Sequence, residues 1–443
     1  MAWKSIQKTK TCFKNKRAAC GTKLARQHLP SMRVTKRFAM EIHDRIINLD
    51  NNATTPVDPQ VNEAMAACQA QGLANPASQH SAGQRARRQL EQLRDQICVH
   101  LRGRRTSGAT DRVIFTSGGT EANNLALCGL VGPPPGRVIV SAVEHPSIQE
   151  PADELQRCGF EVIRLGVDAT GVVCCQQLTD LLTPETRLVS IMLGNNETGV
   201  LQPIRQIASL CEAKGVPLHT DAVQAVGKID VNFQDLGVAA LSLSGHKLHG
   251  PVGIGALLLR STSKIDPLLR GGRQQQGVRP GTESVCLAVG LERALALWLD
   301  QAQSRRQQLS ATRDQLESHL CRQIPQAVIN GGGAPRLPHT SNISFPGVDR
   351  QQLFLALDQA GVACSTGSAC SSGATDPSPV LRAMNVPEAL VEGALRFSVS
   401  VQTTHPQIEL AVDRIVSVFN HLRRDLQAKN RPHPGRHGGA KTL

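Results

Sequence analysis

The sequence predicts an α/β protein with a mostly parallel central sheet and flanking helices, followed by a smaller C-terminal α/β domain. Short runs rich in Val, Ile and Leu recur between residues 112 and 260, and helix-length segments separate them. After about residue 290 the pattern changes, because a long amphipathic segment leads into shorter strand-like and helical stretches. A chain of 443 residues is long enough to build both domains.

Seven apolar runs are expected to form the central sheet. Their length favours buried strands, and the segments between them are long enough for crossover helices. In chain order the runs are RVIFTS (112–117), RVIVSA (137–142), FEVIRLG (160–166), RLVSIML (187–193), VPLHTDA (216–222), ALSLSG (240–245) and IGALLLR (254–260).

The C-terminal part is expected to begin with one long amphipathic helix over residues 291–320. The runs TSNISFPG (340–347) and ALRFSVS (394–400) then belong to the smaller domain. We therefore divide the chain into a basic, disordered N-terminal extension (1–44), a segment packing with the small domain (45–60), a large cofactor-binding domain (61–300), a small C-terminal domain (301–422) and a basic tail (423–443).

The positive charge lies at the two ends of the chain. Residues 1–40 hold eleven Lys or Arg and no acidic residue, and removing both ends from the net charge of +13 leaves the body at about −3. Nucleic acid is therefore an unlikely partner of the body, and an aromatic content of 2% also argues against base stacking. The N-terminus allows a transit peptide, a disordered arm that binds acidic partners, or a start downstream at Met32 or Met40. We favour the last two.

The cysteines and apolar segments indicate a cytoplasmic protein that does not enter the membrane. Thirteen cysteines contain no CxxC pair, which argues against a zinc site or a secreted disulfide framework. No apolar stretch reaches the length of a membrane span, and no signal-peptide core is present.

Polar residues follow five of the predicted strands. In an open α/β sheet, ligands bind beyond the carboxyl ends of the strands, so these residues are expected to line one site. They are Gly118, Gly119 and Thr120, then Glu144 and His145, Asn195 and Asn196, Asp221 and Gln224, and finally Ser244, His246 and Lys247.

Three of these features together specify pyridoxal phosphate (PLP). The glycine turn before a helix suits a phosphate, Asp221 suits a protonated ring nitrogen, and Lys247 supplies an amine for a Schiff base with the aldehyde. Each feature has an ordinary structural explanation when taken alone. The glycines and Asp221 could cap helices, and Lys247 could extend to solvent.

The ordered motifs resemble those of the cysteine desulfurase family, the PLP-dependent class V aminotransferase group of fold type I, and in particular its Fe–S cluster assembly type. The resemblance covers about residues 46–420. It rests on LDNNATTPVDPQV, NPASQHSAGQRAR, FTSGGTEANN, VEHPSI, NNETGVLQPI, HTDAVQAVGK, SGHKLHGPVGIGAL, GGRQQQGVRPGTES, LPHTSNISF, STGSACSSG and ALRFSVS.

The resemblance implies a role for each cofactor-binding residue. Lys247 would bind the cofactor covalently and move protons, Asp221 would hold the ring nitrogen protonated, and Gln224 would reach the ring hydroxyl. His145 would stack on the ring and assist proton transfer. The phosphate would be bound by Gly119, Thr120, Ser244 and His246, and by Thr282 of the neighbouring subunit, which implies a homodimer.

The resemblance also implies the substrate and its nucleophile. Asn196 and Arg396 would hold the carboxylate of L-cysteine, with Arg396 as a two-pronged clamp. Cys370 would attack the sulfur from a mobile loop, residues 364–378, and carry it as a persulfide to an acceptor such as an Fe–S scaffold or a tRNA-thiolation protein. Cys364 is expected to be a core residue.

Other activities and two departures from the family pattern stay open at this point. A selenocysteine lyase or another class V aminotransferase-type enzyme would share the cofactor residues, and the basic ends could add an accessory binding function. Gln275 and Gln276 replace an acidic and a basic residue common in the family, and a second arginine after Arg396 is missing. These departures concern the dimer contact and partner docking more than the chemistry.

Overall fold

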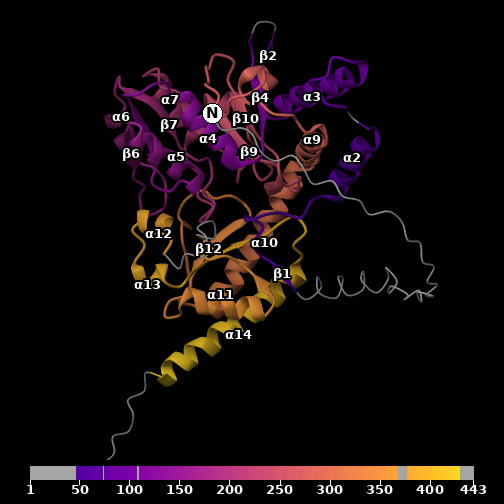
Figure 1. The fold of residues 1–443 in the computed structure, drawn as a ribbon. Coiled ribbons are helices and arrows are strands. Elements are labelled where there is room, and N and C mark those ends of the chain that lie inside the picture. Colours follow the sequence, from indigo (N-terminus) through magenta and orange to yellow (C-terminus); the bar gives the residue numbers. More distant parts are fainter. Residues whose placement is uncertain (1–45, 73, 107–108, 368–376, 430–443) are drawn as a thin grey trace, which may run out of the picture. The chain divides into compact units, whose positions relative to one another are not determined.

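The computed structural model describes residues 46–72, 74–106, 109–367 and 377–429, which belong to one compact unit. The predicted extension 1–44 lies outside the described residues, as does most of the predicted basic tail. The described part contains a large sheet with helices on both faces, and a smaller sheet with its own helices (Figure 1).

All seven predicted runs form strands of the large sheet. They are β4 (Arg112–Thr116), β5 (Arg137–Ser141), β6 (Glu161–Leu165), β7 (Thr186–Ser190), β8 (Leu218–Asp221), β9 (Ala240–Ser244) and β10 (Gly255–Leu259). Their spatial order is β4-β10-β9-β8-β7-β5-β6. The neighbours from β9 to β6 pair in parallel, whereas β10 is antiparallel to both β9 and β4. The predicted α/β class with a mostly parallel sheet is therefore confirmed.

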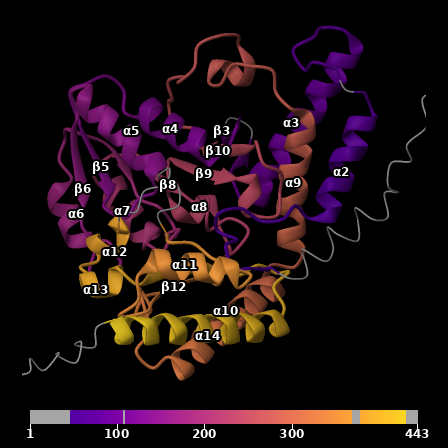
Figure 2. The same cartoon turned by 60° about the horizontal axis from the view of Figure 1, so that its bottom comes forward.

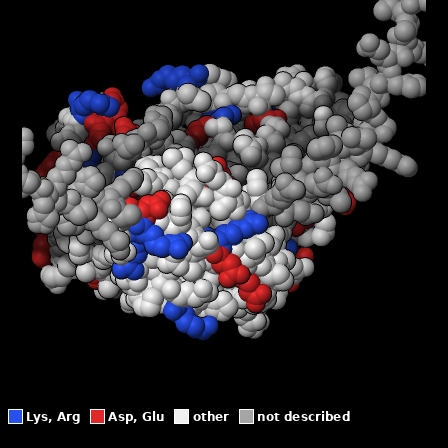
Figure 3. Space-filling view, turned by 90° about the horizontal axis from the view of Figure 1, so that it is seen from below, with Lys and Arg blue, Asp and Glu red and all other residues white. Residues whose placement is uncertain are grey.

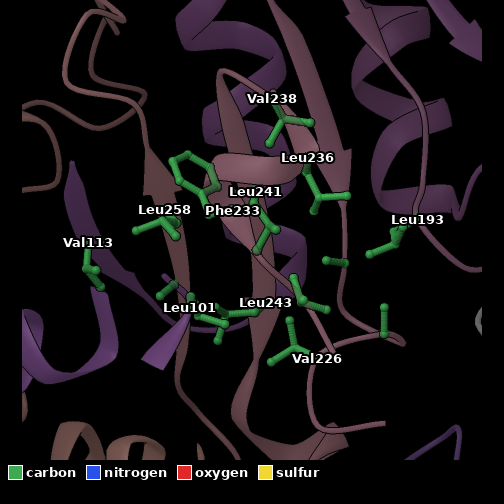
Figure 4. Close-up of a cluster of buried hydrophobic side chains, with 14 of the residues drawn as sticks. Leu101, Val113, Leu193, Val226, Phe233, Leu236, Val238, Leu241, Leu243 and Leu258 are labelled. Atoms are coloured by element: carbon green, nitrogen blue, oxygen red, sulfur yellow. The ribbon is translucent and has the colours of Figure 1, made fainter. Parts of the chain in front are cut away.

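Successive residues of each strand point to opposite faces of the sheet, so two cores form. On one face, Val138 and Val140 of β5 pack with helices α4 (Gly119–Leu130) and α5 (Pro146–Arg157). On the other face, Ile139 joins a larger cluster under the remaining helices of this part. Figure 4 shows side chains of that cluster, including Val113, Leu241, Leu243 and Leu258 from three strands around Phe233.

Further helices and short elements complete the large part. They are α2 (Pro59–Ala70), α3 (Ser81–His100), β2 (Arg105–Thr106), β3 (Ala109–Thr110), α6 (Cys175–Leu181), α7 (Ile204–Glu212), α8 (Phe233–Leu236), η1 (Gly245–Lys247), η2 (Gln274–Gly277) and α9 (Val285–Asp300). Helix α9 packs against α2 and α3 (Figure 1).

The prediction of one long helix over residues 291–320 is wrong. The structure has α9, which ends at Asp300, and α10 (Ala302–Gln323), with Gln301 between them at φ −130° and ψ 18°. The two helices pack on different partners, because α9 lies against α2 and α3 whereas α10 lies against α14 (His405–Lys429) and the smaller sheet. Tertiary packing therefore turns the chain at a residue that carries no local helix-breaking signal.

The smaller sheet contains β11 (Val328–Ile329), β12 (Thr340–Ser344) and β14 (Ala394–Ser398). Its helices are α10, α11 (Arg350–Gln359), α12 (Pro379–Ala383), α13 (Glu388–Val391) and α14. Figure 2 shows α14 running beside α10 and α11. Phe345 contacts both Phe397 and Phe419 at the centre of this core, with ring centroids 6.3 Å and 5.9 Å apart.

The first described strand belongs to the C-terminal part of the protein. Strand β1 (Ile47–Asn48) pairs in parallel with β13 (Val362–Ala363), and Ile47 and Leu49 are buried in the same core as Phe345. This pairing carries the chain past the smaller sheet before it enters α2, and it places residues 50–55 next to the large sheet.

Figure 3 shows one face of the molecule, on which Lys or Arg side chains and Asp or Glu side chains lie among one another. Within the described ranges, every helix is too short or too polar to cross a membrane.

Candidate active site

The carboxyl ends of β4, β5, β7, β8 and β9 meet at one edge of the large sheet. Strands β4 and β9 run in the same direction because both are antiparallel to β10. Asp221 is the last residue of β8, and Ser244 is the last residue of β9. Lys247 ends the short helix that follows β9, so the sheet itself places these residues at the same edge.

Lys247 and Gln224 meet at the carbonyl oxygen of Asn52. The Lys247 Nζ donates to the oxygen of Asn52 at 2.5 Å and to that of Ala53 at 2.8 Å. The Gln224 Nε2 donates to the same Asn52 oxygen at 3.1 Å. Asn52 is itself fixed by the smaller sheet, because its backbone N–H donates to Ser398 Oγ at 2.8 Å and its Nδ2 to Thr340 Oγ1 at 2.9 Å.

Asp221 is buried and receives two hydrogen bonds. The Val223 N–H donates to Oδ1 at 2.9 Å, and the Asn123 Nδ2 donates to Oδ2 at 2.7 Å. These two contacts fix the orientation of the Asp221 carboxyl group at the end of β8.

His145 begins α5 as its N-cap residue. Its Nδ1 accepts from the Ser147 N–H at 3.1 Å and lies 2.8 Å from Ser147 Oγ. Burial lowers the pKa of His145. The Asp221 carboxylate opposes this effect, and the charges of Lys247 and Arg396 reinforce it. His145 therefore shares an electrostatic environment with Asp221, Lys247 and Arg396.

Gly119, in the first turn of α4, lies close to Val223 and Ser244. A Cβ atom on Gly119 would lie 2.7 Å from Val223 Cγ2 and 3.6 Å from Ser244 Cβ, so only glycine fits there without movement. The helix N-terminus offers free N–H groups to an anion. Thr120 is exposed in the first turn of this helix.

The residues at this edge fit a PLP molecule. Among the described residues, Ser244 Oγ and Gln224 Oε1 are buried and have no hydrogen-bond partner, although buried polar atoms normally have one. A phosphate beside Ser244 and a ring hydroxyl beside Gln224 would supply partners for both. His246 lies at the same edge. Burial, with a contribution from Lys247, lowers the pKa of His246 to about 4, and its Nδ1 lies 3.2 Å from Thr54 Oγ1.

Arg396 and Asn196 are brought together from different sheets. The Arg396 Nη1 donates to the Asn196 oxygen at 3.1 Å, and its Nη2 pairs with Asp50 Oδ1 at 2.6 Å. Arg396 Nε and Asn196 Oδ1 are buried without a partner among the described residues. Arg396 therefore has a donor, and Asn196 an acceptor, that no described protein group pairs with.

Three predicted residues remain, namely Thr282, Cys370 and Cys364. Thr282 is exposed in the segment before α9, and within the described chain it makes no hydrogen bond to the residues above. Cys370 lies outside the described residues. Cys364 is buried as expected, and burial, reinforced by the Asp50 carboxylate, raises the pKa of its thiol to about 12. No group of three or more His, Cys, Asp or Glu in the described ranges could hold a metal ion.

Sequence reasoning missed four residues that contact this cluster. They are Asp50, Asn52, Asn123 and Ser147. Each lies inside a motif used for the family resemblance, in LDNNATTP, TEANN or EHPS. Their presence in those motifs was the signal that could have identified them. The motifs do not reveal the contacts of Asp50, Asn52 and Asn123, because their partners lie far away in the sequence.

Lys247, Asp221 and the N-terminus of α4 thus lie at one edge of an α/β sheet, an arrangement that fits a PLP-dependent enzyme. Residues 47–410 match the family model of class-V aminotransferases. The chain is 38% identical to the cysteine desulfurase IscS of Dictyoglomus turgidum over 382 residues, covering 86% of this chain and 96% of that protein. The chain belongs to the class-V aminotransferase family and, within it, to the cysteine desulfurases, which depend on PLP.

Solved structures give the same assignment. The fold matches a NifS-like protein from Rickettsia africae with a TM-score of 0.75 and 32% identity, over 85% of this chain and 99% of that one. It also matches the structure titled SspA in complex with cysteine, with a TM-score of 0.67 and 30% identity, over 81% and 99% of the two chains.

Proposed function

We propose that this protein is a cysteine desulfurase that converts L-cysteine and an enzyme thiol into L-alanine and an enzyme-bound persulfide. The observation that carries the proposal is the meeting of Lys247 and Gln224 on the Asn52 carbonyl, beside the buried carboxylate of Asp221. The relatives named cysteine desulfurase, which the chain matches over most of its length, support the same activity.

The described residues would hold the cofactor at four points. Lys247 would bind its aldehyde carbon, Asp221 its ring nitrogen and Gln224 its ring hydroxyl. Gly119, Thr120, Ser244 and His246 would bind its phosphate. When bound, PLP supplies an electron sink for the bonds broken at the substrate carbons.

The chain's own residues would orient the substrate and move its protons. Arg396 and Asn196 would bind the substrate carboxylate, and the unpartnered Arg396 Nε is a donor available for it. Lys247 would take the proton from the substrate Cα. His145, at the N-terminus of α5, would stack on the cofactor ring and assist in proton transfer.

Cys370 would carry the sulfur. Its thiolate would form a bond to the substrate sulfur while the Cβ–S bond breaks, and the carbon skeleton would leave as alanine after taking a proton at Cβ and regaining one at Cα. The atoms balance, because cysteine and one thiol give alanine and one persulfide. The persulfide would then pass its terminal sulfur to an acceptor, such as an Fe–S scaffold or a tRNA-thiolation protein.

The working enzyme would be a homodimer in the cytoplasm. The exposed Thr282 would reach the phosphate bound in the second subunit. The exposed apolar side chains of Leu268 and Leu269, in the segment that leads to Thr282, support a protein contact there. A sequence rich in cysteine without CxxC pairs supports a reducing compartment.

The test is product release from L-cysteine in the presence of a reductant, for the wild type and Cys370→Ser. The wild type should release alanine and sulfide, and the variant should retain the cofactor absorbance but release neither product. If Cys370→Ser releases sulfide as fast as the wild type, the persulfide role is wrong. Activity with selenocysteine alone would instead indicate a selenocysteine lyase.

A further inference from the structure

Asn123 lies in α4 directly beneath the site and is 1% exposed. Its Nδ2 donates to Asp221 Oδ2 at 2.7 Å and to Ser147 Oγ at 2.8 Å. A carboxylate accepts hydrogen bonds and cannot donate them, so the Asn123 amide must present its NH₂ group to Asp221. The same NH₂ group therefore also acts as the donor to Ser147.

The orientation of Asn123 determines the role of the Ser147 hydroxyl. Since Ser147 Oγ accepts from Asn123, its own hydrogen is free to point to His145 Nδ1, 2.8 Å away. The Ser147 backbone N–H donates to the same nitrogen at 3.1 Å. With two donors directed at Nδ1, the neutral imidazole must carry its hydrogen on Nε2.

We propose that Asn123 is a positioning residue that links Asp221 to His145 through Ser147 and keeps His145 in its Nε2–H form. This inference rests on the proposed function, in which Asp221 and His145 face the cofactor. In this form His145 can donate a hydrogen bond at Nε2 but cannot accept a proton there. Lys247 is then the group that removes the substrate proton, and His145 acts as a donor.

The chain of hydrogen bonds makes a specific prediction for the protonation of His145. Adding a proton at Nδ1 forces Ser147 to turn its hydroxyl hydrogen away and to accept from Nδ1–H with its second lone pair. The hydrogen bond from Asn123 to Ser147 Oγ makes the hydroxyl a better donor to Nδ1 and a weaker acceptor, so protonation becomes easier without Asn123. The charged groups that act on His145 from neighbouring elements are Asp221, Lys247 and Arg396, and Asp221 keeps the hydrogen bond from the Val223 N–H in either case.

The experiment is an NMR titration of full-length protein freed of cofactor, with histidine labelled by ¹³C at Cε1. The His145 signal is assigned by its loss in His145→Gln. We expect Asn123→Ala to raise the titration midpoint of His145 by about one pH unit, the scale of one hydrogen bond to a charged group. Ser147→Ala should also raise it, because the neutral ring loses a donor.

The double variant tests whether Asn123 acts on His145 through the Ser147 hydroxyl. In the Ser147→Ala background, Asn123→Ala should cause a clearly smaller shift, because only its hydrogen bond to Asp221 then remains to act on His145. The matched control is Asn124→Ala, a change one residue further along the same helix turn, where the Nδ2 donates to the Thr120 oxygen at 2.9 Å and to the Ser147 backbone oxygen at 3.5 Å but does not bond to the Ser147 hydroxyl. It should leave the midpoint at the wild-type value.

Three results would overturn the proposal. They are an unchanged midpoint in Asn123→Ala, an unchanged midpoint in Ser147→Ala, and an Asn123→Ala shift of the same size with and without Ser147. If Asn123→Ala does not fold, an unchanged midpoint of His145 in Ser147→Ala still overturns the proposal. The titration needs neither cofactor nor cysteine, so its result is distinguishable from a failure of the proposed desulfurase activity.

Discussion

The Nζ of Lys228 donates a hydrogen bond of 2.5 Å to the backbone carbonyl of Lys247. A second lysine therefore lies directly under the residue that would bind the cofactor. Lys228 is 2% exposed, and burial lowers its pKa to about 7, with the charges of Lys247 and Arg305 adding to the effect. The contribution of Lys228 to the free energy of unfolding therefore depends on pH.

Replacing Lys228 by Met should remove part of the pH dependence of stability. The pKa of an unfolded lysine is about 10.4, so between about pH 7 and 10 the unfolded chain binds more protons at this residue than the folded one. The wild type should therefore gain free energy of unfolding from pH 7.5 to 9.5 relative to Lys228→Met. Urea unfolding of the cofactor-free proteins at both pH values measures it, and equal slopes would contradict the prediction.

Replacing Glu144 by Gln should change the pH dependence in the opposite direction. Burial raises the pKa of Glu144 to about 8, against the hydrogen bonds that its Oε1 accepts from Ser141 Oγ and the Met192 N–H. The folded state then binds more protons than the unfolded chain between about pH 4.3 and 8, so stability falls as pH rises through this range.

Glutamine keeps an acceptor for Ser141 and Met192 but does not titrate. From pH 5 to 8, the wild type should therefore lose free energy of unfolding relative to Glu144→Gln, as measured by urea unfolding of both proteins. A difference between the two proteins that stays constant with pH would show that Glu144 is ionised throughout the range.

Replacing Gly119 by Ala should weaken binding of PLP by at least about tenfold. The added Cβ would lie 2.7 Å from Val223 Cγ2, within the region proposed for the phosphate. Combining the change with Val223→Ala removes that contact and should restore part of the affinity. Titration of the cofactor-free protein with PLP, followed by absorbance, gives the dissociation constants.

The control for this prediction is Gly166→Ala, where the nearest atom to an added Cβ is Gln177 Oε1 at 3.6 Å. It should bind PLP like the wild type. If Gly119→Ala also binds PLP like the wild type, the phosphate does not sit against Gly119.

Replacing Arg396 by Lys should raise the KM for L-cysteine by about tenfold or more and change kcat less. A lysine cannot reproduce the two-pronged contact of a guanidinium with a carboxylate. Arg336→Lys is the control, because Arg336 forms a two-pronged pair with Glu317, at 2.6 Å and 2.9 Å, outside the proposed site. Steady-state kinetics should show a raised KM only for Arg396→Lys, and a loss in kcat alone would contradict a role in carboxylate binding.

The strands and the strand-end residues could be predicted because their signals are local. An apolar run such as RVIVSA and the polar residues after it lie within ten residues of one another, and parallel strands bring their ends to one edge. His145, Asp221 and Lys247 were therefore found from sequence, and so were the roles of Asp221 and Lys247, whereas the role of His145 came from the family resemblance.

The contacts that complete the site could not be predicted in this way. The Asn52 carbonyl meets Lys247 across 195 residues, and the Asn123 amide meets Asp221 across 98. Neither residue type nor spacing carries that information, because the contacts depend on how elements far apart in the sequence pack against one another. The break at Gln301 was missed for a related reason, since the helices on its two sides follow different partners.

The contact between Asn52 and β14 has a consequence for the stage of translation at which the site can form. Asn52, which accepts the Lys247 amine, is held by Ser398, a residue synthesised 346 positions later. At roughly 10 residues per second, about half a minute separates the two. Lys247 is made 195 residues after Asn52, so for the remainder of that interval the nascent chain contains Lys247 but lacks the residue that fixes Asn52. A complete cofactor site therefore forms only when translation is nearly finished.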